Sequence, residues 1–183
     1  EIVEETRSEI DHLESILTSL DTAQNEADIA QIRKEMTDSS YIRARADKKN
    51  PKKAKTPASA PLHFVSSDGF DIYVGKNNYQ NEEVTFKIAS GGDWWFHTKT
   101  IPGSHVIVKS KGEPELPDHI YEIAASLAAY YSTGRDTEKV EIDYVQRKEL
   151  RKVAGAAPGY VIYHTNYSMV AKPEISEGLS AVQ

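Results

Sequence analysis

Apolar positions near the start of the chain recur with a helical spacing of three, four and three residues. The first set that shares this spacing is Ile10, Leu13, Leu17 and Leu20. After the interruption "SLDTAQNEADIAQ", the pattern resumes at a second set: Ile29, Ile32 and Met36. This pattern is the seam of a coiled coil or helical hairpin. We therefore expect two short antiparallel helices over residues 1–42, as the end of a longer coiled coil.

Beyond residue 61 the period of the apolar pattern changes from helical to alternating. "LHFVSSDGFDIYVG" places Ser67-Asp68-Gly69 between two alternating runs, which predicts a β-hairpin. "EVTFKIAS" is another alternating run, and "KVEIDYV", "GYVIYH" and "SMVAKP" continue the series of short strands. Together with the runs around residues 93–109, these segments predict about seven short strands.

One segment of this second region has a clear helical pattern. "PDHIYEIAASLAAYYS" carries an apolar stripe at helical spacing, with alanines that permit close packing on a sheet. The stripe consists of Ile120, Ile123, Ala124, Leu127, Ala128 and Tyr131. The expected fold class is therefore α+β: a mixed sheet of about seven short strands with one main packing helix, preceded by a short helical hairpin.

Charge divides the chain into three parts. The 183 residues carry a net charge of -6, but residues 1–42 hold eleven acids and three bases, and residues 43–61 hold seven bases and one acid. The composition of residues 43–61 predicts a solvated linker, either a plain tether or a basic arm that lies on phosphates. We expect a coiled-coil end (1–42), this linker (43–61) and an α+β domain (62–183). The acidic total argues against indiscriminate nucleic-acid binding but leaves a local basic surface open.

Composition also limits the chemistry. The chain has no cysteine, which excludes disulfides, thiolate zinc sites and a cysteine nucleophile, and fits a reducing compartment such as the cytoplasm. The sequence has no apolar run near the ~20 residues that cross a bilayer, so no membrane partner is expected.

The stretch "DWWFHTKTIPGSHVIVKS" (93–110) is unusually rich in aromatic and imidazole side chains. If residues 93–97 and 105–109 are strands, alternation places two sets of side chains on opposite faces. The expected core face is Trp94, Phe96, Val106 and Val108. The expected outer face is Asp93, Trp95, His97, His105 and Ile107. The outer face is either a functional surface or a region where Trp95 packs under a loop and the histidines are ordinary satisfied polar residues.

Catalytic and metal-binding motifs are weak. A metal could be held by Asp93, His97 and His105, but their spacing lacks the short helical repeat of typical metal sites. The sequence has no nucleophile elbow and no phosphate-binding loop. We therefore expect neither an enzyme nor a bound metal or cofactor.

Nucleic-acid contact fits the residues better. "QRKELRKVAGAAPG" forms one basic face if it is helical, with Arg147, Lys148, Arg151 and Lys152 at i, i+1, i+4 and i+5. An aromatic platform beside bases can hold unpaired RNA by stacking and phosphate neutralisation. The alternative is an ordinary solvated face. The full set of candidate nucleic-acid-binding residues is Trp95, His97, Lys99, His105, Lys76, Asn77, Asn78, Arg147, Lys148, Arg151 and Lys152.

Several long blocks of the sequence, in the same order, resemble the NFACT-R domain of the NFACT family (RqcH/FbpA-like proteins). The blocks, which span about residues 62–173, are "SSDGFDIYVGKNNYQNEEVTFKIA", "DWWFHTKTIPGSHVIV", "EIAASLAAYYS", "VEIDYVQRKELRKVAGAAPGYVIY" and "MVAKP". Residues 1–61 are similar to the end of the coiled-coil region that precedes this domain. One block departs mildly, since Val145-Gln146 stands where a Thr-x-Val-like pattern is expected.

The resemblance implies a ribosome-associated quality-control factor. Such a factor recognises an obstructed large ribosomal subunit with peptidyl-tRNA and supports template-free alanine tailing, so the implied partners are the large subunit, rRNA and tRNA. The ribosome makes the peptide bonds, and the domain needs no catalytic residue. The alternative is a cell-surface adhesin that binds fibronectin or fibrinogen.

Overall fold

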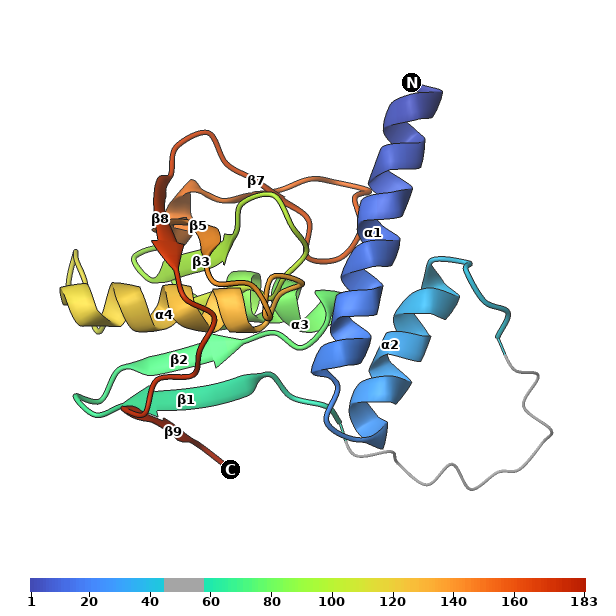
Figure 1. Cartoon of the computed structure of the whole chain (residues 1–183). Coiled ribbons are helices and arrows are strands. Elements are labelled where there is room, and N and C mark those ends of the chain that lie inside the picture. The colour runs from blue at the N-terminus through green and yellow to red at the C-terminus, as the bar shows by residue number, and fades with distance from the viewer. Residues whose placement is uncertain (45–57) are drawn as a thin grey trace.

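The computed structural model describes residues 1–44 and 58–183, and it begins with the expected helical hairpin (Figure 1). Helix α1 spans Ile2–Thr22 and helix α2 spans Glu26–Asp38. The turn between them ends at Asn25, whose side chain caps α2 by accepting a hydrogen bond from the backbone N–H of Asp28. Most of the predicted basic linker, residues 45–57, lies outside the described residues.

An antiparallel sheet of seven strands forms the centre of the second region. Its order is β8-β5-β3-β4-β2-β1-β9, and every pairing in it is antiparallel. The strands are β1 (Leu62–Ser66), β2 (Asp71–Val74), β3 (Trp94–Thr98), β4 (Val106–Val108), β5 (Val140–Gln146), β8 (Tyr167–Ala171) and β9 (Leu179–Ala181). The short strands β6 (Arg151–Lys152) and β7 (Val161–Ile162) pair separately. The predicted α+β class, with seven strands and a helical hairpin, is confirmed, and the sheet is antiparallel throughout where a mixed one was expected.

Helix α4 (Asp118–Tyr130) covers one face of the sheet and forms the larger core. Its predicted stripe is buried, with Ile120, Leu127 and Ala128 fully inside. They pack against the strand side chains that alternation assigned to the core, including Trp94 and Phe96. A continuous apolar stripe on a helix and one face of a sheet therefore account for this half of the fold.

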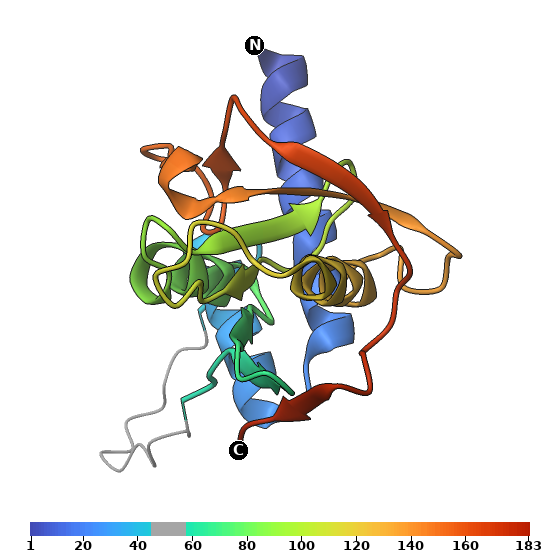
Figure 2. The same ribbon diagram turned by 90° about the vertical axis from the view of Figure 1, so that its left-hand side faces the viewer.

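The other face of the sheet is covered by a helical segment where the sequence predicted a strand. Residues Asn78–Glu83 form α3, which continues as a π-helix over Val84–Ile88. The strand prediction for "EVTFKIAS" is wrong because Asn77 starts a helix here: its side chain accepts a hydrogen bond from the Gln80 N–H at 3.0 Å. Figure 2 shows α3 and α4 on opposite sides of the sheet. The central strands β3 and β4 are thus buried on both faces.

The hairpin packs against α3 through polar side chains. Asp28 of α2 pairs with Lys76 at 2.7 Å, and both are buried. Asn78 donates hydrogen bonds to Ser15 Oγ and Glu35 Oε1, each at 2.7 Å. We call these contacts between the hairpin and residues 76–80 the polar joint. They hold the hairpin in a fixed orientation on the domain.

The predicted apolar seam of α1 lies on a different face from this joint. Ile16 is 2% exposed, whereas its neighbour Leu17 is 61% exposed. The rest of the seam is also exposed, at Ile10, Leu13 and Leu20. The periodicity therefore identified a helix correctly, but the side chains of the seam are largely exposed in the described part of the chain.

Candidate nucleic-acid interface

Trp95 points away from the α4 core, as alternation predicts, but it is not at the surface. Its side chain is 1% exposed, compared with 6% for Trp94. Trp95 packs in a second core with Val84, Ile107, Val145 and Leu150. The prediction of a solvent-facing tryptophan platform is wrong because α3 and the segment after β5 cover this face.

Three rings surround Trp95 beneath this cover. The imidazole of His97 stacks on the indole with 5.5 Å between ring centroids. His105 and Tyr163 meet the indole edge-on, at 5.3 Å and 5.2 Å. The strands β3 and β4 and the segment after β7 thus bring together one aromatic cluster.

Both histidines in this cluster are electrically neutral at pH 7. Burial lowers the pKa of His97, although its Nε2–H donates to the Gly103 carbonyl at 3.2 Å. Burial, together with the neighbouring His97, lowers the pKa of His105 well below its usual range. His105 Nδ1 hydrogen-bonds with Thr85 Oγ1 at 2.8 Å. Neither ring supplies positive charge to a phosphate at neutral pH.

The glycine of the "PGSH" block is explained by close approach of the backbone. A Cβ at Gly103 would lie 2.8 Å from Thr98 Oγ1 and 3.0 Å from Ser132 Cβ. The chain must pass this near to the end of β3 to place His105 under α3, where its N–H donates to Asn81 Oδ1 at 3.0 Å. The glycine of this motif is therefore needed because a side chain at this position would clash with Thr98 and Ser132.

Three predicted RNA-binding residues belong to the polar joint instead. Lys76 is 6% exposed and paired with Asp28, Asn77 donates to Gln31 Oε1 at 2.8 Å, and Asn78 bonds the hairpin. Their hydrogen-bonding groups are occupied by the hairpin. The prediction that they extend an open RNA surface is wrong.

The basic segment is not the helix that the sequence predicted. Residues Arg147–Glu149 form a single 3-10 turn and Arg151–Lys152 form β6, because Leu150 is buried against Trp95 and turns the chain back over the sheet. Arg147 lies 4.7 Å above the Phe86 ring, and its Nε donates to the Thr85 carbonyl at 3.0 Å. The basic residues nevertheless gather on this cover. We call the following set the basic strip: Lys87, Arg147, Lys148, Arg151 and Lys152.

Members of the basic strip differ in whether their charged groups already have partners within the protein. Lys148, Arg151 and Lys152 are exposed. The guanidinium of Arg151 donates to the carbonyls of Lys148 and Leu150, and Lys152 forms an ion pair with Glu82 at 2.6 Å. Lys87, which was not among the predicted residues, is exposed on the π-helix next to Phe86. Lys87 was missed because residues 84–88 were expected to form a strand, whereas they form a π-helix.

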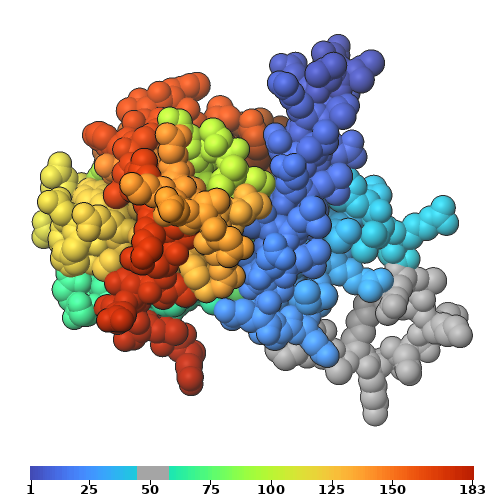
Figure 3. All heavy atoms as spheres, in the orientation of Figure 1, coloured from blue at the N-terminus to red at the C-terminus, as the bar shows by residue number. Residues whose placement is uncertain are grey.

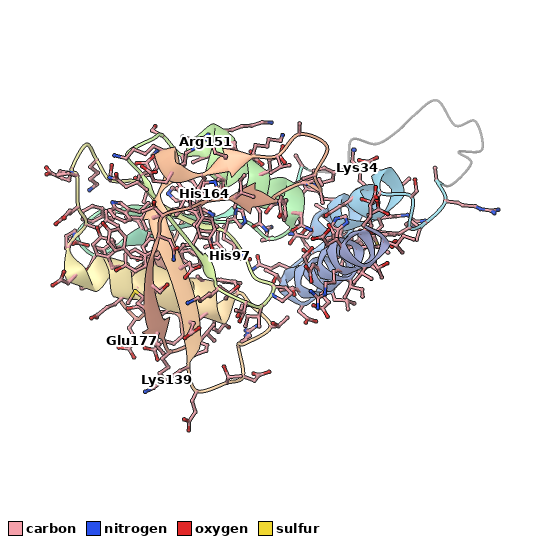
Figure 4. The ribbon with its side chains drawn as sticks, turned by 90° about the horizontal axis from the view of Figure 1, so that it is seen from above. Lys34, His97, Lys139, Arg151, His164 and Glu177 are labelled. Atoms are coloured by element: carbon pink, nitrogen blue, oxygen red, sulfur yellow. The ribbon has the colours of Figure 1, made fainter. Side chains whose placement is uncertain are left out.

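A groove with a volume of about 690 Å³ separates α1 from the domain. Its walls are α1, the loop of residues 98–103 and the loop of residues 156–161. Trp95, His97, Lys99 and His105 all line it. Figure 4 labels His97 and Arg151 in separate parts of the domain, so the single predicted surface divides into this groove and the basic strip.

Asp93, the third candidate metal ligand, has a structural role. Burial alone would raise its pKa, but the Lys109 ammonium and the N–H groups of Ser110 and Ser90 outweigh it, so the pKa of Asp93 is lowered. Within residues 1–44 and 58–183 no group of three or more metal-ligating side chains exists. No helix in that same part of the chain is long and apolar enough to span a membrane.

Two family models cover most of the sequence. Residues 61–165 match the model described as the NFACT protein RNA binding domain. The chain belongs to the NFACT family. Residues 1–55 match the model of the NFACT N-terminal and middle domains, so the hairpin of this NFACT chain lies in the part that matches one region, and strands β1 to β7 lie in the part that matches the next.

Curated relatives of this NFACT chain are bacterial and eukaryotic. "Rqc2 homolog RqcH" of Streptococcus suis is 40% identical over 173 residues, which cover 94% of this chain and 30% of that protein. The protein of the same name from Bacillus subtilis is 36% identical, over 92% of this chain and 29% of its own length. Coiled-coil domain-containing protein 25 of Bos taurus is 30% identical over 55% of this chain and 50% of its own. The chain thus spans about a third of the bacterial relatives.

A solved structure has the same fold. The C-terminal part of the fibronectin/fibrinogen-binding protein from Streptococcus suis superposes with a TM-score of 0.82 at 38% identity. The match covers 94% of this chain and 67% of that one. The hairpin and the sheet are therefore shared as one unit with that protein.

Proposed function

We propose that this chain contributes the RNA-binding module of a ribosome-associated quality-control factor. The observation that carries the proposal is the match of residues 61–165 to an NFACT RNA binding domain. The similarity to RqcH proteins over more than nine-tenths of the chain supports the ribosomal setting. The partners would be the large ribosomal subunit, rRNA and tRNA, in the cytoplasm.

The basic strip is the surface on which phosphates would bind. Lys148 and Arg151 are exposed on the layer that covers Trp95, and Arg147 is held in place by Phe86 and Thr85. A planar guanidinium fixed in this way loses little conformational entropy when it binds a phosphate. Trp95 supports this layer from below and does not stack on bases.

Binding to RNA across a salt series tests the strip. Neutralising two cations, in Lys148→Gln with Arg151→Gln, should weaken binding, because fewer counterions are then released from the RNA. The slope of log K against log salt should become shallower by about 0.7–0.9 for each phosphate that the variant no longer neutralises. The probe is a single-stranded RNA of mixed sequence, measured by fluorescence anisotropy.

The matched control removes two positive charges elsewhere, in Lys139→Gln with Lys172→Gln, both exposed. This control should keep most of the wild-type slope. An equally shallow slope in both double variants would show that only overall charge matters, and would contradict the assignment of the strip.

The finer part of the proposal is that the full-length protein binds large subunits obstructed by peptidyl-tRNA and supports alanine tailing. The ribosome would form the peptide bonds, which requires no catalytic group in this domain. Sedimentation of the full-length protein with purified large subunits, with and without peptidyl-tRNA, tests it. If the same fraction of the protein sediments with large subunits that carry peptidyl-tRNA and with those that do not, the proposal is contradicted.

A second candidate function is adhesion, because the solved relative from Streptococcus suis is described as binding fibronectin and fibrinogen. Immobilised fibronectin and fibrinogen should therefore be tested alongside RNA. Tight, saturable binding to either protein by a chain that does not bind RNA would replace the first proposal with this one.

A further inference from the structure

The groove beside α1 differs in charge from the basic strip. Its α1 wall carries the carboxylates of Glu4, Asp11 and Glu14, all exposed, and one base, Arg7. Lys99 is the lysine on the opposite wall. Because His97 and His105 are neutral, the three carboxylates outnumber the two bases by one, which leaves an excess of negative charge. A phosphate backbone would be repelled here.

The floor of the groove presents aromatic rings to any occupant. His97 and Tyr163 are partly exposed there above the buried Trp95. Tyr163 donates a hydrogen bond to Asp143 Oδ2 at 2.8 Å, and burial together with this carboxylate raises the pKa of Tyr163, so the phenol stays neutral. Ring faces backed by a carboxylate attract cations.

A buried donor without a partner adjoins the same floor. Trp95 lines the groove, and its indole Nε1–H has no hydrogen-bond partner within the described residues although the ring is 1% exposed. Buried N–H groups in proteins are nearly always paired. A ligand carbonyl reaching the floor after a small side-chain movement would satisfy this donor, and peptide backbones carry such carbonyls at every residue.

The shape of the groove suits a short extended chain. Its volume of about 690 Å³ falls in the usual range of ligand sites, and apolar residues of both loops, including Ile101 and Pro158, line its sides. The polar joint fixes α1 on the domain, so the acidic wall is in place before any ligand arrives. Figure 3 shows the first turns of α1 extending beyond the rest of the domain.

We propose that this groove binds a basic peptide segment of a partner protein. An arginine or lysine side chain would lie over the rings of His97 and Tyr163, with its charge facing the carboxylates of α1. The peptide site is separate from the RNA surface of the basic strip and does not depend on it. The domain would thereby contact a ribonucleoprotein through its RNA at the basic strip and through its protein at the groove.

A defined peptide tests the proposal with the complete chain. The probe is a fluorescein-labelled heptapeptide, Gly-Arg-Gly-Arg-Gly-Arg-Gly, and its partner peptide carries uncharged citrulline in place of arginine. We expect saturable binding of the arginine peptide and at least about tenfold weaker binding of the citrulline peptide, because the attraction depends on charge. Equal binding of the two peptides would overturn the proposal.

Two double variants locate the site. Asp11→Asn with Glu14→Gln should weaken the arginine peptide at least about fivefold. The matched control, Glu5→Gln with Glu9→Gln, removes two carboxylates of the same helix that do not line the groove and should change the affinity less than twofold. If both pairs weaken binding equally, the peptide senses only the acidity of the helix and the groove assignment is wrong.

Trp95 provides a direct reporter. The chain has two tryptophans, so Trp94→Phe leaves the indole of the groove as the sole tryptophan, and circular dichroism checks that this variant is folded. The arginine peptide should change its fluorescence, whereas single-stranded RNA bound to the basic strip should neither change it nor displace the peptide. RNA that displaces the peptide and alters Trp95 emission would assign the groove to RNA and refute the peptide site. Failure of RNA binding alone would refute only the proposed function.

Discussion

Adjacent tryptophans in one strand are both buried here, in separate cores, although they point in opposite directions. Alternation correctly assigned Trp94 and Trp95 to opposite faces, and the register confirms it, with Trp95 opposite Ile107 and Val145. The alternating pattern does not show which other residues of the chain cover each face of the strand. Leu150 belongs to the segment expected to be a basic helix and Tyr163 to the run "GYVIYH", and neither pattern indicates that these side chains close over Trp95.

Substitution of either tryptophan by alanine should destabilise the protein to a similar degree. Both Trp94→Ala and Trp95→Ala remove a large buried aromatic, which costs about 3–5 kcal/mol. Chemical denaturation monitored by circular dichroism measures both. Tyr160→Ala, at a 52% exposed aromatic on the rim of the groove, should change stability by less than about 0.5 kcal/mol. A small loss of stability in Trp95→Ala alone would mean that this indole is solvated in solution.

At the scale of elements, apolar periodicity predicted the helices more reliably than it predicted their contacts. The helices α1, α2 and α4 all lie where their stripes predict. In α1, however, the face that packs on the domain carries polar side chains such as Ser15 and Ser19. Sequence patterns show hydrophobic surfaces, and a hydrogen-bonded interface has no such signature.

Removing the charge at the polar joint should destabilise the attachment of the hairpin. Asp28→Asn leaves Lys76 buried without an opposite charge, and breaking a buried pair in this way costs about 3–5 kcal/mol. Hydrogen exchange of α2 and thermal unfolding measure the effect. Glu174→Gln breaks the exposed pair with Lys172 and should cost less than about 1 kcal/mol. Equal effects would show that the joint is solvated.

At the scale of the whole molecule, the sequence predicted the class and the family but not the arrangement of the site. The blocks that resemble NFACT-R span the RNA binding domain found by comparison. The candidate residues nevertheless divide among the polar joint, the groove and the basic strip. Lys76 illustrates the reason. A lysine next to two asparagines predicts an exposed polar loop, and the sequence does not show that Asp28, 48 positions earlier, lies beside it and forms a buried ion pair.

Acid should destabilise the molecule in two steps. Burial lowers the pKa of His97 and His105 below the value near 6.5 of an unfolded histidine, so the unfolded chain binds protons first and stability falls as the pH drops through about 6.5. A second decrease in stability follows at lower pH. Hydrogen bonds and Lys76 outweigh burial and lower the pKa of Asp28, so its contribution is present above about pH 4 and disappears as the pH falls through its folded pKa.

Thermal unfolding from pH 8 to pH 3 measures both steps. His105→Gln should reduce the first step relative to the wild-type chain, and His164→Gln, at an exposed position, should leave it unchanged. A stability that is flat between pH 8 and pH 5.5 in the wild-type chain would contradict the neutral, buried state of the two imidazoles.

The polar joint holds α1 at one place on the domain, so a small change of its angle there gives a larger displacement at its first residues. The helix has 21 residues and is therefore about 30 Å long, and its first turns extend past the domain (Figure 1). A tilt of about 10° at a fixed end would carry the other end of a rod of this length through about 5 Å. Because hydrogen bonds around Asn78 hold α1 on the domain, a change at the joint would move the first turns of α1 relative to the domain.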